Sequence, residues 1–308
     1  MVVQAPAVVG ARTRGFRVGP YVALTKPRII ELLLVTTLPT MVIAQRGLPS
    51  LGLVVATLVG GTLAAGGANA VNMYVDRDID QVMHRTRHRP IVTGAVSPRS
   101  ALAFALALEV VAFAELWAFV NLLSAVLALS ATGFYVFVYT LWLKRRSTQN
   151  IVIGGAAGAV PVLVGWSAVT GRLALVPVLL FALIFIWTPP HFWALAVRYR
   201  DDYEAAHVPM LPAVATFART ARDILAYTVV LVGVSLALAP VAHLGVFYTT
   251  VAAVAGAGYL VMALHLWRGA TAERATERDA MRLFGYSITY LTVLFVAMAG
   301  DVFIQRLH

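Results

Sequence analysis

Residues 71–94 read VNMYVDRDIDQVMHRTRHRPIVTG, and they overlap the end of a run at residues 47–75 that contains no charged side chain. Within this segment Asn72, Asp76 and Asp80 stand four residues apart. On a helix, side chains four residues apart are neighbours on one face. An amide and two carboxylates therefore line up where an apolar helix ends, and Pro90 prevents any helix from continuing.

These oxygen-bearing side chains predict a site for a divalent cation. The C-terminal end of a helix carries partial negative charge, so carboxylates there need a cation to balance them. Arg77 lies within the cluster and is one candidate for this role. Mg²⁺ prefers hard oxygen ligands, commonly one or two carboxylates together with the phosphates of a substrate. The alternative is a solvated helix end whose charges only mark the membrane interface.

The composition is that of a protein that crosses a membrane many times. Of the 308 residues, 60% are hydrophobic and 12% are charged, whereas a soluble domain is about 25% charged. The chain has no cysteine, which excludes disulfides and thiolate chemistry. In such a protein the net charge of +10 reflects topology rather than nucleic-acid binding. We expect one transmembrane domain, residues 21–308, after a flexible N-terminal arm, residues 1–20.

Apolar runs of about 20 residues cross a bilayer as helices, and this chain contains about nine of them. We therefore expect an all-α, polytopic membrane protein whose helices form one bundle. The predicted spans are residues 29–44, 51–71, 101–120, 122–143, 150–170, 173–197, 224–242, 246–267 and 283–304.

The distribution of positive charge orients these spans, because cytoplasmic segments are enriched in Lys and Arg. Of the 24 Lys and Arg residues, 21 fall on the side of the N-terminus and three on the other side. We expect a cytoplasmic N-terminus, an external C-terminus and a functional cytoplasmic face, where the two longest loops lie. The arm lacks the apolar core of a secretory signal. It favours a bacterial inner membrane, with the mitochondrial inner membrane as the alternative.

A second acidic cluster follows the sixth predicted span on the same side of the membrane. Asp201 and Asp202 lie just past the end of that span. Two such clusters are what a diphosphate bridged by metal ions requires, although a solvated loop also carries carboxylates. Basic side chains of the same face are candidates to contact phosphate oxygens. They include Arg28, Arg77, Lys144, Arg145, Arg198 and Arg200.

Several ionisable residues, among them Glu109, Glu115, His191 and Asp301, lie inside predicted spans, where such side chains are costly and are candidates for function. His191 follows Pro189 and Pro190 in the sixth span. It either contacts a macrocycle or its metal, or forms a hydrogen bond with a neighbouring helix. Asp301 lies near the end of the last span and is expected to be solvated, and the sequence identifies no partner for Glu109.

Taken together, these features resemble the UbiA-type intramembrane prenyltransferases. The motif N-x-x-x-D-x-x-x-D of that superfamily matches Asn72, Asp76 and Asp80. Other stretches resemble its heme-farnesylating branch. They are LTKPRI at 24–29, NMYVDRDID at 72–80, YTLWLKRRSTQNIVIGG at 139–155, PHFWALA at 190–196 and DYEAAHVPMLP at 202–212. The chain departs from the second motif, D-x-x-x-D, because Arg198 stands four residues before Asp202, so that Asp201 is a candidate substitute.

The resemblance implies transfer of a farnesyl group from farnesyl diphosphate to a vinyl group of protoheme IX (heme b), which gives heme O and pyrophosphate. It implies Mg²⁺ bound by Asn72, Asp76, Asp80 and Asp202, with Lys144 as a further catalytic residue. The substrate-binding residues it implies are Arg28, Arg77, Arg145, Tyr139, Tyr203, Asp201 and His191. Heme A synthase or a terminal-oxidase assembly are candidate partners, and no nucleic acid is expected.

Three other functions stay open at this point. One is a sister prenyltransferase that acts on a quinone-precursor aromatic or a chlorophyllide, against which the stretches PHFWALA and STQNIVIGG argue. Another is a transporter, but transporters place their coupling residues near the bilayer midplane rather than at one interface. The last is a heme-handling protein without catalysis, which would form no product in a magnesium-dependent way.

Overall fold

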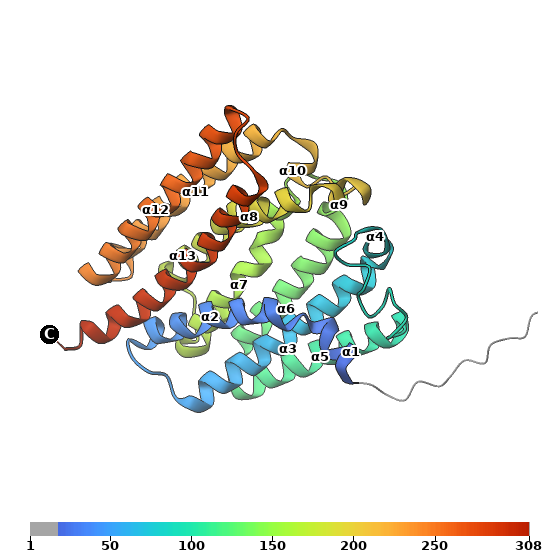
Figure 1. The fold of residues 1–308 in the computed structure, drawn as a ribbon. Coiled ribbons are helices and arrows are strands. Elements are labelled where there is room, and N and C mark those ends of the chain that lie inside the picture. The colour runs from blue at the N-terminus through green and yellow to red at the C-terminus, as the bar shows by residue number, and fades with distance from the viewer. Residues whose placement is uncertain (1–17, 308) are drawn as a thin grey trace, which may run out of the picture.

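The computed structural model describes residues 18–307, apart from the side chains of residues 28–34. Most of the predicted N-terminal arm and the side chain of Arg28 therefore lie outside the described residues. The described part of the chain is helical and contains no strand (Figure 1). This confirms the predicted all-α class, whereas the domain boundary at residue 20 stays a prediction.

The long helices coincide with the nine predicted spans. They are α2 (Pro27–Gln45), α3 (Leu51–Val75), α5 (Pro98–Phe119), α6 (Leu122–Gly133) continued by η1 (Phe134–Leu143), α7 (Asn150–Thr170), α8 (Leu175–Arg198), α11 (Phe217–Val241), α12 (Val246–Thr271) and α13 (Glu277–Ile304). Eight of them are long and apolar enough to cross a membrane, and the apolar stretch Val35–Gln45 belongs to α2, within the residues that could be assessed. The polytopic membrane fold is thereby confirmed, and its orientation stays a prediction.

Four short helices connect the long ones: α1 (Val18–Thr25), α4 (Arg77–Val82), α9 (Arg200–Ala205) and α10 (Leu211–Val214). Of these, α4, α9 and α10 lie at one end of the bundle, and the C-terminus lies at the opposite end (Figure 1). The most extensive helix pairs are α3 with α5, α7 with α8, and α11 with both α8 and α12. The long loops predicted to carry function therefore gather at a single end.

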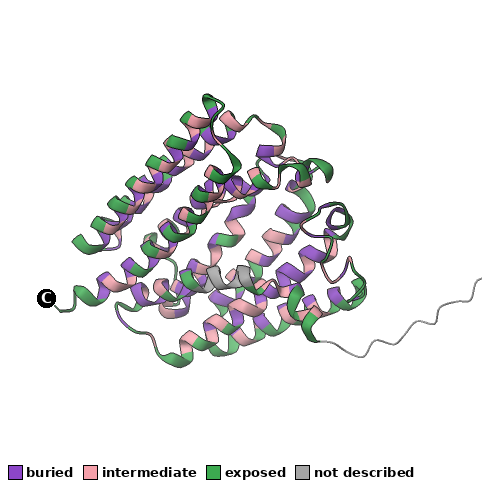
Figure 2. Cartoon of the chain, in the orientation of Figure 1, coloured by how far each residue is buried: buried purple, intermediate pink, exposed green. Residues whose placement is uncertain are grey.

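Polar side chains define where several spans begin. Ser50, Ser97, Asn121 and Thr216 each accept a hydrogen bond from the backbone N–H three residues later. Such caps satisfy donors that the first helical turn leaves free. Between their ends the helices turn buried residues inward (Figure 2). Their outer faces expose large apolar side chains such as Val110, Phe137 and Val254, as contact with lipid requires.

The packing of α3 against α5 explains the intramembrane Glu109. This side chain is buried and accepts a hydrogen bond from Thr132 Oγ1 at 3.2 Å, which is the partner that the sequence does not identify. It fits because Gly67 has no side chain: a Cβ atom there would lie 2.5 Å from Glu109 Oε1. The small residue at position 67 of α3 therefore allows close helix packing.

The expectation that Asp301 is solvated is wrong. Its side chain is buried, and its two oxygens accept the backbone N–H groups of Gly245 at 2.6 Å and Tyr248 at 3.2 Å. These donors lie at the start of α12, where helical N–H groups have no partner within their own helix. Asp301 therefore acts as a cap supplied by α13.

Candidate functional site

The three residues of the first motif share one buried face. Helix α3 ends at Val75 and α4 begins at Arg77, so only Asp76 interrupts the helical path. The backbone bonds across this break, Asp76 N to Asn72 O and Asp80 N to Asp76 O, are both 2.9 Å long and keep the four-residue repeat. Asn72, Asp76 and Asp80 are all buried, which confirms that they lie on a common face.

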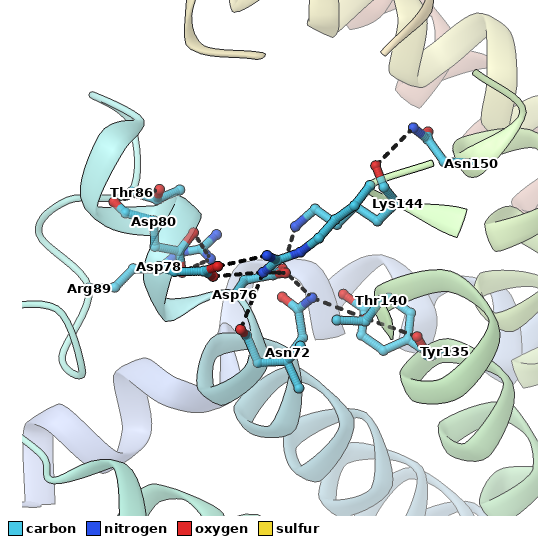
Figure 3. A network of polar contacts seen from close by, with 12 residues as sticks. Asn72, Asp76, Asp78, Asp80, Thr86, Arg89, Tyr135, Thr140, Lys144 and Asn150 are labelled. Atoms are coloured by element: carbon cyan, nitrogen blue, oxygen red, sulfur yellow. Dashed lines mark hydrogen bonds and ion pairs between the residues drawn. The ribbon is translucent and has the colours of Figure 1, made fainter. Parts of the chain in front are cut away.

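Asp76 is the centre of the polar network in Figure 3. Its Oδ2 atom pairs with the ammonium group of Lys144 and accepts a hydrogen bond of 2.7 Å from Asn72 Nδ2. Its Oδ1 atom lies 3.7 Å from Arg145 Nη2 and has no hydrogen-bond partner, although the residue is fully buried. An unsatisfied buried carboxylate oxygen is costly, and it leaves a position at which a cation can bind.

The two neighbouring carboxylates pair with separate arginines. Asp80 accepts bonds of 2.8 and 2.6 Å from Arg89 Nη1, and both partners are largely shielded from solvent. Asp78 accepts two bonds of 2.7 and 2.6 Å from Arg145. These bonds lower the pKa of Asp78 from 3.8 to about 2. Three adjacent carboxylates are thus balanced by Lys144, Arg145 and Arg89.

A π-helix brings the opposite wall of the site into contact with this motif. Helix η1 (Phe134–Leu143) continues α6, and its backbone bonds span five residues, as in Lys144 N to Tyr139 O at 2.8 Å. Its wider turn places Thr140 Oγ1 3.2 Å from Asn72 Nδ2 and directs Lys144 toward Asp76 (Figure 3). Such π-helical turns are rare and often occur at functional sites. Sequence periodicity does not reveal this one.

Lys26 is a site residue that the sequence analysis missed. It lies between α1 and α2 with a left-handed φ of 53°, and its Nζ atom donates to Asn72 Oδ1 at 3.0 Å. Its pKa is well below the ordinary value because the ammonium group is buried and Arg89 and Lys144 repel it. The signal in the sequence was a lysine directly before Pro27, at the start of an apolar span.

Arg77 does not balance a carboxylate of the cluster, and that expectation is wrong. It donates to the carbonyl oxygen of Tyr74 at 2.6 Å, and its guanidinium carbon lies 4.7 Å from the centroid of the Tyr74 ring. Residue 77 follows Asp76 directly and so points about 100° away from it around the helix. Whether Arg77 contacts a phosphate stays a prediction.

The predicted aromatic residues lie on two elements. Tyr139 is buried on η1 and stacks on Tyr135, with ring centroids 5.3 Å apart. A Cβ atom at Gly154 would lie 2.3 Å from the Tyr139 ring, so α7 needs a glycine at this contact. Tyr203 is buried on α9, and this burial raises the pKa of its phenol. Their contact with substrate stays a prediction.

The second acidic segment lies at the same end of the bundle as the first, as predicted, but the two meet through a loop. Asp202 Oδ1 accepts the backbone N–H of His84, and Oδ2 accepts that of Arg85, both at 3.0 Å. Asp201 is exposed. Among the side chains that the structure describes, no group of three or more His, Cys, Asp or Glu is gathered closely enough to hold a metal ion. The predicted four-residue ligand set therefore stays a prediction.

The structure supports the second interpretation of His191, in which its side chain forms a hydrogen bond with a neighbouring helix. Its Nδ1 atom lies 2.7 Å from Ser287 Oγ on α13. Trp187 stacks on its ring at 4.1 Å between centroids, and Phe284 stacks at 4.6 Å. The imidazole is therefore held between aromatic rings of α8 and α13, and a role toward heme stays a prediction.

Comparison with known proteins identifies the family over most of the chain. Its sequence matches the UbiA prenyltransferase family over residues 33–299. A protein of Parafrankia sp. (strain EAN1pec) named protoheme IX farnesyltransferase is 56% identical over 284 residues, which are 92% of this chain and 90% of that protein. A protein of the same name from Streptomyces avermitilis is 54% identical over 297 residues, 96% of this chain and 97% of that protein.

Solved structures share the fold at low sequence identity. A UbiA homologue from Aeropyrum pernix K1 superposes with a TM-score of 0.68 at 19% identity, covering 91% of this chain and 98% of that one. A UbiA homologue from Archaeoglobus fulgidus, solved with GPP and Mg²⁺, superposes with a TM-score of 0.60 at 16% identity, covering 91% of this chain and 99% of that one. The sequence match, the shared fold and the buried Asn–Asp–Asp row agree that this chain belongs to the UbiA prenyltransferase family and is a membrane-embedded prenyltransferase.

Proposed function

We propose that this enzyme transfers a farnesyl group from farnesyl diphosphate to a vinyl group of heme b, releasing pyrophosphate and giving heme O. The names of the 51–56% identical relatives support this choice of substrates. We place the enzyme in a bacterial inner membrane with the carboxylate cluster toward the cytoplasm, since these relatives are bacterial and positive charge is concentrated at that face. The observation that carries the proposal is the buried Asp76 with cationic neighbours and one unsatisfied oxygen.

The donors at this site suit Mg²⁺. Asp76 Oδ1 is buried and lacks a hydrogen bond, and the side chains of Asn72 and Asp80 lie on the same helical face. An amide and two carboxylates are hard oxygen donors of the kind that Mg²⁺ binds together with phosphate. When bound, the ion neutralises charge on the leaving diphosphate. The Archaeoglobus fulgidus homologue, solved with GPP and Mg²⁺, supports such an arrangement on this fold.

The chain's own cations then act on the diphosphate. Lys144 and Arg145, which follow η1, contact Asp76. Lys26 contacts Asn72, and Arg89 contacts Asp80. As the allylic C–O bond breaks, its electron pair moves to the diphosphate, and these groups stabilise the growing negative charge. Fixed charges aimed at developing charge are usually the largest contribution to catalysis. No side-chain nucleophile is needed, which agrees with the lack of cysteine.

The carbon skeleton is completed among apolar helices. A vinyl carbon of heme attacks the allylic cation, and the new cation on the heme side chain takes up water and loses a proton, leaving a hydroxyl group. The stacked rings of Tyr135 and Tyr139 lie beside the polar network. The faces of aromatic rings attract cations, so these residues are suited to stabilise the allylic cation before the acceptor reacts.

The decisive experiment combines purified protein, farnesyl diphosphate, heme b and Mg²⁺, and follows the products by mass spectrometry. We expect a heme whose mass has grown by one farnesyl group and one hydroxyl group, and we expect none with EDTA. Parallel reactions replace heme by a quinone-precursor aromatic or by chlorophyllide. Prenylation of one of those acceptors instead of heme, or no consumption of the diphosphate, would refute the proposed function.

A further inference from the structure

The carboxylate of Asp202 fastens a loop. Residue 202 lies on α9, and both of its oxygens accept backbone N–H groups, those of His84 and Arg85, at 3.0 Å. The next two amides, of Thr86 and Arg87, are satisfied inside the loop by the carbonyl oxygen of Met83 at 3.1 Å. Asp202 therefore supplies the acceptors for two adjacent amides of this loop. Bonds from N–H groups to an ionised carboxylate are among the stronger hydrogen bonds.

A second contact holds the same loop to the same place. The guanidinium carbon of Arg85 lies 5.1 Å from the centroid of the Tyr199 ring, in a cation–π contact. Tyr199 is the residue that separates α8 from α9. The loop is thus attached to the α8–α9 junction by one side chain and two backbone groups.

The other side of the loop faces the first motif. Thr86 Oγ1 donates to the carbonyl oxygen of Asp80 at 3.2 Å, and Arg89 Nη1 contacts both carboxylate oxygens of Asp80 (Figure 3). Residues 84–89 therefore connect the second acidic segment to the first. The backbone bond from Arg89 N to Thr86 O, 3.0 Å long, links Arg89 to the part of the loop that Asp202 holds.

The residue at the position that would complete a second carboxylate motif is an arginine, and it contacts another helix. Arg198, four residues before Asp202, lies 3.5 Å from a carboxylate oxygen of Glu277 on α13. The position four residues before Asp202 thus carries no carboxylate, Asp201 is exposed, and both oxygens of Asp202 already accept N–H groups. A metal ion bound there would have to displace hydrogen bonds that the loop needs.

We propose that Asp202 is a positioning residue: it holds residues 84–89 over the first motif and so places Arg89 to receive the diphosphate, in place of binding Mg²⁺. This role rests on the proposed function, because it identifies the ligand of Arg89 as the diphosphate. It also assigns the metal to the first motif, where Asp76 Oδ1 is buried and has no hydrogen-bond partner.

Hydrogen–deuterium exchange of the metal-free protein tests the proposal without any substrate. In Asp202→Asn the side-chain amide keeps one acceptor oxygen. Its NH₂ group faces the other backbone N–H group, so that one hydrogen bond is lost. We expect the amides of His84 and Arg85 to exchange about tenfold faster or more, which corresponds to the loss of one such bond. Asp202→Glu keeps the carboxylate and should retain most of the protection. Glu204→Gln, on the exposed face of α9, is the matched control and should exchange like the original protein.

Stabilisation by Mg²⁺ separates the two roles of Asp202. The shift of the thermal midpoint with Mg²⁺ concentration reports binding to the folded protein. We expect Asp202→Asn to reach half of its Mg²⁺-induced rise in thermal midpoint at the same Mg²⁺ concentration as the original protein. In the farnesyl transfer assay, we expect its KM for farnesyl diphosphate to rise by a larger factor than its kcat falls. Unchanged exchange at His84 and Arg85, or a Mg²⁺ requirement raised more than about tenfold as for a lost ligand, would overturn the proposal.

A second variant tests the attachment of the loop independently, in case Asp202→Asn does not fold. Tyr199→Leu removes the ring beneath Arg85 and leaves both bonds to Asp202 in place. We expect faster exchange at the Arg85 amide alone, and an unaltered Arg85 amide would count against the attachment. Because exchange is measured without heme or diphosphate, failure of the proposed function leaves this result interpretable.

Discussion

Replacing Asp76 by Asn removes a negative charge from a fully buried position while the size of the side chain stays nearly the same. Lys144, whose side chain is only 12% exposed, then loses its ion-pair partner. Breaking a buried ion pair by removing one partner costs about 3–5 kcal/mol. The new amide still accepts a hydrogen bond and Lys144 keeps some solvent access, so we expect the lower end, about 3 kcal/mol. The thermal midpoint in detergent should fall by about 5–10 °C.

The effect of Asp76→Asn on turnover should be larger than its effect on folding. The site loses a buried carboxylate oxygen without a hydrogen-bond partner, Asp76 Oδ1, and the group that orients Lys144. Removing one element of preorganised electrostatic stabilisation costs about 100- to 1,000-fold in kcat. The assay is the appearance of farnesylated heme by mass spectrometry, measured well below the midpoint of the variant so that the protein stays folded.

Asp78→Asn is the control for Asp76→Asn. It removes a carboxylate two residues away that is also paired with Arg145 but is 60% exposed. An exposed pair contributes less than about 1 kcal/mol, so this variant should stay close to the original protein in stability and lose far less turnover. If Asp76→Asn farnesylates heme within about threefold of the original rate, Asp76 is not part of the diphosphate site and the proposed chemistry is wrong.

Three further predictions follow from particular contacts. Lys26→Met should leave the thermal midpoint unchanged or raise it, because a buried cation with a lowered pKa is removed, yet turnover should fall about 100-fold; equal activity would exclude Lys26 from the site. Gly67→Ala should lower the yield of folded protein and its midpoint, because the new Cβ would lie 2.5 Å from Glu109 Oε1, whereas Gly67→Ala with Glu109→Ala should recover both. The ion pair of Asp78 with Arg145 should stabilise the fold above the ordinary pKa of 3.8 and lose this contribution as the pH falls toward 2; midpoints of the Asp78→Asn variant should lack that loss.

Much of the architecture could be predicted from the sequence because it depends on local patterns. Each membrane span is an apolar run that is long enough to cross the bilayer, and its backbone satisfies itself as a helix whatever its neighbours are. The nine predicted spans therefore match the helices to within a few residues at most ends. The row of Asn72, Asp76 and Asp80 was equally predictable, since a four-residue repeat places side chains on one helical face.

The partners of these residues were not predictable, because they come from distant parts of the chain. Asn72 binds Lys26 from 46 residues away, Asp76 binds Lys144 from 68 residues away, and Asp202 binds the amide of His84 from 118 residues away. Spacing favoured Arg77, which is adjacent in sequence but turned away by the helix. The π-helix that ends just before Lys144 leaves no periodic signal in the sequence.

The sequence by itself determined an all-helical membrane protein with a row of oxygen donors at one end of the bundle. Hydrophobic length and helical periodicity are local properties, and they are sufficient for both conclusions. Only the tertiary structure decided which cation balances each carboxylate, which oxygen of Asp76 stays open, and that Asp202 holds a loop. These outcomes depend on how the helices pack and where the ends of α4, η1 and α9 meet, because ion pairs and hydrogen bonds form over a few ångströms.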